Sequence, residues 1–168
     1  MPPGREATRR APAPNVTLAD PGAGTALIGA SLLGTALFTL TAVAAAIAPH
    51  TLDIPALVVS VTMFLAGTAA FVWAYLVAVV RSRRDAVAIV GVYGLGAGST
   101  PQPVRIRLLG SLGAEVAVAV VTAAVRPYTS LSFGILAPMW GLGLAGVWGA
   151  RHGGFPARSP DPRRLPKR

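Results

Sequence analysis

The stretch 54–84 reads IPALVVSVTMFLAGTAAFVWAYLVAVVRSRR, an uncharged run that stops at three arginines. About 20 apolar residues are enough for a helix to cross the roughly 30 Å hydrocarbon core of a bilayer, so we interpret 54–80 as a transmembrane helix. Three further apolar runs occupy 25–48, 108–125 and 131–150. The sequence therefore predicts an all-α fold, a transmembrane four-helix bundle made of two hairpins.

Basic residues divide the connections between these runs into two kinds. Every arginine and lysine except Arg126 lies before the first run, between the second and the third, or after the fourth. Because positive charge is retained on the cytoplasmic face of a membrane, we expect the tail 1–24, the loop 81–107 and the tail 151–168 to be cytoplasmic. Both tails are rich in proline and charge, so we expect them to be disordered.

Composition argues against several classes of function. Only 12% of the residues are charged, against about 25% in soluble proteins, and no basic module that would indicate a nucleic-acid partner is visible. The chain has no cysteine, so it can form neither a disulfide nor a thiolate metal site. His50 and His152 lie on opposite sides of the predicted membrane. We expect no metal, no cofactor and no enzymatic activity, because no run carries a catalytic set of side chains.

The ends of the runs predict how the helices are connected. Pro49 should end the first helix and Asp53 should cap the second, so that Pro49–Asp53 forms a tight turn. Between the second and third runs, the apolar segment 86–98 is too short and too rich in glycine to span the membrane. We interpret it as interfacial or partly re-entrant.

Small residues recur at every fourth position of two runs, which allows helix backbones to approach closely in a bilayer. We expect these ladders to pack within the bundle rather than to form a dimer face. Their members are Ala66, Ala70, Ala74 and Ala78 in the second run, and Ala137, Gly141, Ala145 and Gly149 in the fourth.

Arginines at the ends of the runs are placed to contact lipid headgroups. We expect this contact for Arg81, Arg83, Arg84, Arg105, Arg107 and Arg151. Membrane lipids are thus expected partners, and the ladders leave room for another membrane protein or a second copy of the chain.

Glu115 is the one ionisable side chain inside the predicted runs, roughly 12 Å below the start of its helix at 1.5 Å per residue. Intramembrane acids are candidates for function by default. In the second hairpin Glu115 stands level with Gly141, so the indole N–H of the adjacent Trp140 could donate to the carboxyl. Ser31 and Thr35 of the first run lie at a similar depth and are further candidate partners. Pro138 should kink the fourth helix and free the carbonyl of Gly134. Glu115 is therefore either a protonated strut between helices or a proton-binding site.

The C-terminal stretch 133–156, FGILAPMWGLGLAGVWGARHGGFP, resembles the end of small, uncharacterised, four-span integral membrane proteins of actinobacteria. This resemblance implies a source and a membrane location but no activity. The abundance of Arg, Ala, Gly and Pro also indicates a GC-rich bacterial source, and hence the plasma membrane. We expect a non-enzymatic accessory or assembly subunit. The alternative is a small oligomeric transporter or proton-coupled channel that uses Glu115.

Overall fold

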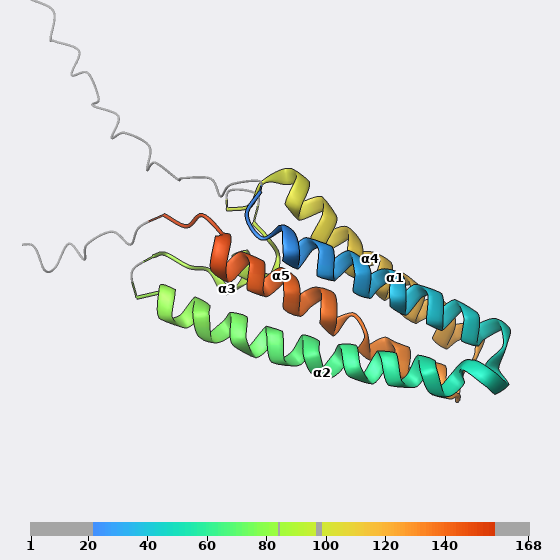
Figure 1. The fold of residues 1–168 in the computed structure, drawn as a ribbon. Helices are drawn as coiled ribbons and strands as arrows, with labels where there is room; N and C mark the ends of the chain where they lie inside the picture. The colour runs from blue at the N-terminus through green and yellow to red at the C-terminus, as the bar shows by residue number, and fades with distance from the viewer. Residues whose placement is uncertain (1–21, 84, 97–98, 157–168) are drawn as a thin grey trace, which may run out of the picture.

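The computed structural model describes residues 22–83, 85–96 and 99–156 (Figure 1). All elements assigned within these residues are helices, so the predicted all-α fold is confirmed. In chain order they are α1 (Thr25–Ile47), α2 (Pro49–Arg81), the short α3 (Ile89–Tyr93), α4 (Gln102–Val125), the 3₁₀ helix η1 (Ser130–Leu136) and α5 (Met139–His152).

Four helical segments of the described chain are long and apolar enough to cross a membrane. They are Thr25–Ile47, His50–Arg81, Gln102–Val125 and Ser130–His152. The last is composite, because it contains both η1 and α5. The protein is therefore a multi-pass integral membrane protein built as a helical bundle.

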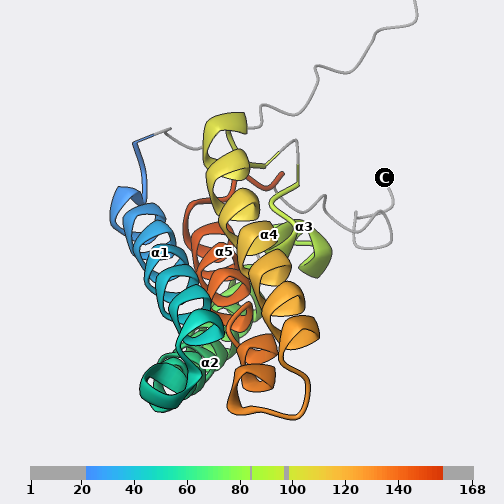
Figure 2. The ribbon, with the colours of Figure 1, turned by 90° about the vertical axis from the view of Figure 1, so that its right-hand side faces the viewer.

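The two hairpins of the bundle reverse direction at the same end (Figures 1 and 2). We call this end, which holds the α1–α2 turn and the turn from α4 into η1, the turn end. The start of α1, the end of α2, the start of α4 and the end of α5 lie together at the opposite end, which we call the terminal end. Here α3 packs against α5.

The start of α2 differs from the prediction. The helix begins at Pro49 and only Ala48 separates it from α1, so the expected turn Pro49–Asp53 and the Asp53 cap are wrong. Proline is well tolerated in the first helical turn because its missing N–H would have no partner there. Asp53 instead lies within α2, where its Oδ1 is buried without a hydrogen-bond partner among the described residues.

The segment between α2 and α4 folds onto the bundle. Its short helix α3 buries Val92 completely, and the hydroxyl of Tyr93 donates to the carbonyl of Phe71 over 2.9 Å. The rings of Tyr93 and Phe71 stack with their centroids 4.4 Å apart. α4 begins at Gln102, well before the predicted apolar run at 108, so Arg105 and Arg107 lie on a helix and not in a loop.

The prediction of a disordered tail from 151 onward is wrong for 151–156. Arg151 and His152 complete α5, and the next residues pack against the middle segment. The Gly154 N–H donates to the carbonyl of Ser99, and Pro156 accepts from the Ala86 N–H, both over 2.9 Å. Most of both predicted tails, residues 1–21 and 157–168, lies outside the described residues.

α5 is the central helix of the terminal half, and almost every residue from Gly141 to Ala150 is buried. Neighbouring helices can approach a buried helix closely only where it carries small residues. The glycines of α5 meet this need on three sides: Gly141 faces α4, Gly143 faces α2, Gly146 faces α2 and α3, and Gly149 faces α3. All members of the ladder predicted in the fourth run, Ala137 included, are buried.

The ladder predicted in the second run is shifted at one end. Ala74 and Ala78 are buried and Ala70 is half-buried, but Ala66 is exposed. Gly67 takes its place, because its backbone lies directly against Met139 at the start of α5. This shift from position 66 to position 67 follows from the helical repeat. With 3.6 residues per turn, residues spaced four apart move gradually around the helix and away from its buried face.

Candidate functional site

Glu115 lies near the middle of α4 and is 0% exposed. Its Oε1 lies 2.7 Å from the hydroxyl of Thr35 on α1. Its Oε2 accepts a hydrogen bond of 3.1 Å from the backbone N–H of Gly141 on α5. One carboxyl therefore joins three helices in the interior of the bundle.

Pro138 explains why Gly141 needs this partner. The helix is interrupted at this proline, because Ala137 and Pro138 lie between the end of η1 and the start of α5. The predicted free carbonyl of Gly134 is wrong, because it accepts from the Ala137 N–H over 3.0 Å. Gly141 is the third residue of α5, where a backbone N–H has no acceptor within its own helix. An unpaired N–H in a bilayer costs several kcal/mol, so the Glu115 carboxyl serves as the cap of α5.

The hydroxyl of Thr35 makes two contacts but carries one proton. Its Oγ1 lies 2.7 Å from Glu115 and 2.9 Å from the carbonyl oxygen of Ser31. The hydroxyl can share its one proton between the two acceptors, or a protonated Glu115 can supply a second proton. In the second arrangement the carboxyl donates to Thr35, Thr35 donates to Ser31, and the other carboxyl oxygen accepts from Gly141. The geometry therefore fits a neutral Glu115 with every polar atom satisfied.

Trp140 lies beside this site but binds elsewhere. The predicted hydrogen bond from its indole to Glu115 is wrong, because Nε1 donates to the carbonyl of Ala30 over 3.3 Å. The indole lies so close to α1 that a Cβ at Gly34 would collide with it. Trp140 thus fixes the start of α5 to α1, while Glu115 fixes it to α4.

A second polar contact lies toward the terminal end of the same interface. The hydroxyls of Ser31 on α1 and Ser111 on α4 are both buried and lie 2.6 Å apart. Two polar contacts, one turn apart on α4, therefore link α1 to α4. In a bilayer such hydrogen bonds hold helices together where the hydrophobic effect cannot.

The other titratable groups do not assemble around Glu115. None of the residues hydrogen-bonded to its carboxyl is ionisable. Within the described residues, no group of three His, Cys, Asp or Glu side chains could hold a metal ion. His50 lies in the first turn of α2 and His152 at the end of α5, at opposite ends of the bundle. The arrangement around Glu115 can hold one proton and cap one helix.

Arg81, predicted to contact lipid headgroups, instead turns inward. Its Nη1 donates to the carbonyl of Ala150 over 2.7 Å, and its Nη2 donates to Gly153 over 3.1 Å. Nη2 also lies 3.4 Å from the Asp85 carboxylate. Because cations are favoured at helix C-termini, Arg81 caps α5 at the terminal end. The exposed arginines at this end are Arg83, Arg105, Arg107 and Arg151, and Arg84 lies outside the described residues.

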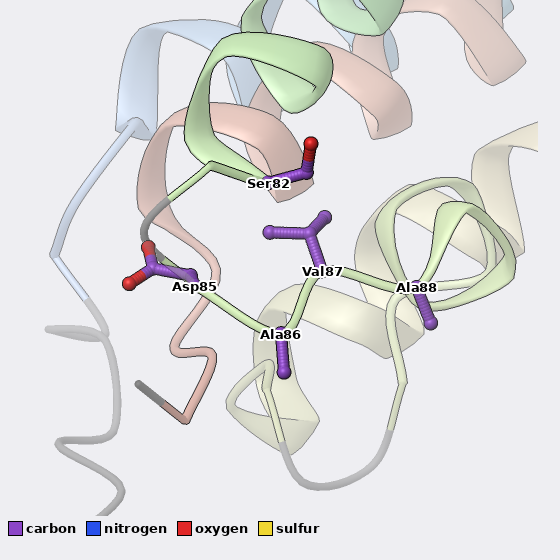
Figure 3. Close-up of a pocket in the computed structure, with 5 residues that line it drawn as sticks. All are labelled: Ser82, Asp85, Ala86, Val87 and Ala88. Carbon is purple, nitrogen blue, oxygen red and sulfur yellow. The ribbon is translucent and has the colours of Figure 1, made fainter. Parts of the chain in front are cut away.

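A shallow pocket of about 360 Å³ lies beside this cap (Figure 3). It is lined by Ser82, Asp85, Ala86, Val87 and Ala88. Asp85 is the charged member of this lining and is already paired with Arg81. In Figure 3 its carboxylate points away from Val87. The hydroxyl of Ser82, the other polar side chain of this lining, donates to the carbonyl of Val79 over 2.7 Å.

Two functional groups were missed by reasoning from the sequence. The Gly141 N–H was predicted only as a neighbour of Glu115, although Pro138, three positions earlier, signals a helix start that needs an acceptor. The inward role of Arg81 had a weaker signal, namely that Asp85 follows it at a spacing of four residues, which favours pairing.

No family model, no curated protein and no solved structure matches this chain.

Proposed function

We propose that this protein is a non-enzymatic structural component of a bacterial plasma membrane, an accessory or assembly subunit. The observation that carries the proposal is the enclosure of Glu115, whose side chain is 0% exposed. Both of its oxygens are already engaged, by Thr35 and by Gly141. A transporter or proton-coupled channel would need this carboxyl to be reached and released in every cycle. A fully buried carboxyl that caps the start of α5 supports a role in stabilising the bundle instead.

The proposal includes an orientation with both termini in the cytoplasm. Exposed arginines gather at the terminal end of the described chain. Arg126, at the turn end, is half-buried and donates to the carbonyl of Ala46 over 3.2 Å. Reporter fusions after Asp85 should give a cytoplasmic signal, and fusions at the exposed Tyr128 should give an exterior one. A cytoplasmic signal from Tyr128 would contradict this orientation.

The stabilising role is tested by replacing Glu115 in a strain that lacks the gene. Glu115→Gln keeps a carbonyl for Gly141 and an amide donor for Thr35 but cannot exchange a proton. We expect this variant to complement fully any phenotype of the deletion, at an unchanged protein level. A stable but inactive Glu115→Gln protein would exclude the structural proposal and favour a proton-coupled transporter.

A further inference from the structure

Four exposed arginines lie around the terminal end of the bundle. Arg83 follows the end of α2, Arg105 and Arg107 lie in the first turns of α4, and Arg151 lies in the last turn of α5. We call this set the arginine rim. Asp85 is the acidic residue at this end of the described chain, and Arg81 already pairs with it. Nothing in the described structure therefore neutralises the arginine rim.

The arginine rim lies at the level where lipid headgroups meet the protein. Arg107 directly precedes the apolar part of α4, and Arg83 lies two positions beyond the last residue of α2. Arginine side chains at such positions extend along the helix toward the phosphate layer. The large apolar side chain of Ile106, between Arg105 and Arg107, is also exposed. An exposed apolar side chain between two exposed arginines suits a lipid interface better than water.

An apolar groove lies on the surface of α2 near the same end. Trp73, Leu76, Val77 and Val80 line it, it ends at Arg81, and its volume is about 280 Å³. Trp73 is exposed, as is typical of residues at a membrane interface. An acidic protein or a nucleic acid could neutralise the arginine rim but would leave this groove empty. A phospholipid supplies both an anion and an apolar chain.

We infer that the terminal end of this protein binds anionic phospholipids, with the phosphates on the arginine rim and an acyl chain in the groove of α2. The inference does not depend on the proposed structural role or on which side of the membrane this end faces. Each arginine near an anionic surface contributes about 1 kcal/mol, which corresponds to about a fivefold change in affinity. The preference for an anionic headgroup should therefore fall stepwise as arginines are removed.

Native mass spectrometry of the purified full chain can measure this preference. Phosphatidylglycerol and phosphatidylcholine with identical acyl chains compete for the protein, and the ratio of retained lipids is recorded. We expect the wild type to prefer phosphatidylglycerol and each single Arg→Gln change in the rim to lower that preference by up to about fivefold. The variant R83Q/R105Q/R107Q/R151Q should lose it. These side chains are exposed, so the variant should still fold.

The matched control is Arg126→Gln, which removes one arginine at the turn end and should leave the preference unchanged. Equal retention of the two lipids by the wild type would overturn the inference, and so would an unchanged preference in the variant with four substitutions. If the wild type shows no preference between the lipids but binds a polyglutamate peptide through the rim, the lipid assignment is wrong and the partner is an acidic protein.

Trp73 reports directly on the groove. Phosphatidylglycerol with brominated acyl chains should quench tryptophan fluorescence more strongly than brominated phosphatidylcholine at equal mole fraction, and Arg83→Gln should reduce the difference. Trp148 is buried, and Trp140 is half-buried with its indole hydrogen-bonded to α1, so both should contribute less than Trp73. Trp73→Phe should therefore remove most of the lipid-dependent signal. Equal quenching by the two brominated lipids would contradict occupation of the groove by an anionic lipid.

Discussion

α2 and the fourth membrane-spanning segment both contain a proline, but only the fourth segment is broken by it. α2 continues as one helix through Pro55, from Pro49 to Arg81, whereas Pro138 separates η1 from α5. The segments also differ in burial. In the most apolar part of α2, 22% of the residues are buried, against 50% in the fourth segment. α2 thus lies on the outside of the bundle and α5 at its centre.

The surroundings of each proline explain the difference. The carbonyl that Pro55 leaves unpaired belongs to Thr51, an exposed residue at the turn end, where water or a headgroup can bind it. Pro138 lies inside the bundle, so the broken backbone must find its partners in the protein. Ala137 donates to Gly134, and Gly141 donates to Glu115. A broken helix at the centre of a membrane bundle therefore requires a polar group on a neighbouring helix.

The largest effect is expected from Gly143→Leu in α5. A Cβ at Gly143 would collide with the carbonyl of Gly67 in α2, so the two helices would have to separate. Overpacking of this kind costs about 1–3 kcal/mol and sometimes more. We expect a loss at or above the upper end of this range, measured by thermal or denaturant unfolding in detergent.

Ala66→Leu is the matched control for this comparison. It adds similar bulk to α2 at an exposed position, where changes are usually within about 0.5 kcal/mol. Equal losses of stability in the two variants would mean that α2 and α5 are packed alike.

A smaller effect is expected from Arg81→Gln, which removes the connection from the end of α2 to the end of α5. Hydrogen bonds to charged groups contribute about 1.5–3 kcal/mol. The Arg81 side chain is 30% exposed, so we expect the lower end of that range. Amide hydrogen exchange should also become faster in the last turn of α5. The control Arg83→Gln alters an exposed arginine and should change neither quantity, and faster exchange in both variants would rule out a specific cap by Arg81.

The apolar runs and the charged residues between them were sufficient to predict the number of membrane-spanning segments and the hairpin register that brings Glu115 beside Gly141. They were not sufficient to predict how the helices end. Hydropathy does not mark the start of α4, because Arg105 is as compatible with helix as with loop. Likewise, Pro49 can either stop one helix or start the next. In the structure Pro49 starts α2.

The partners inside the candidate site were harder to predict than its position. Glu115 was identified because it is the one ionisable side chain inside the predicted runs. The choice between the Trp140 indole and the Gly141 N–H depends on which way the chain turns after Pro138, and a side-chain pattern does not encode that turn. Thr35 could be proposed as a partner because it lies at a similar depth in the first run, and its hydroxyl is 2.7 Å from Oε1 of Glu115.

The unfolding free energies of Glu115→Gln and Glu115→Leu in detergent test most directly whether Glu115 is a neutral cap of α5. The amide of Gln can accept from Gly141 and donate to Thr35, so we expect the unfolding free energy of Glu115→Gln to stay close to that of the wild type and above that of Glu115→Leu. Glu115→Leu leaves the buried Gly141 N–H without an acceptor and should cost about 1–3 kcal/mol. A Glu115→Gln protein as unstable as Glu115→Leu would contradict the neutral cap and indicate that the bundle needs a charged carboxylate.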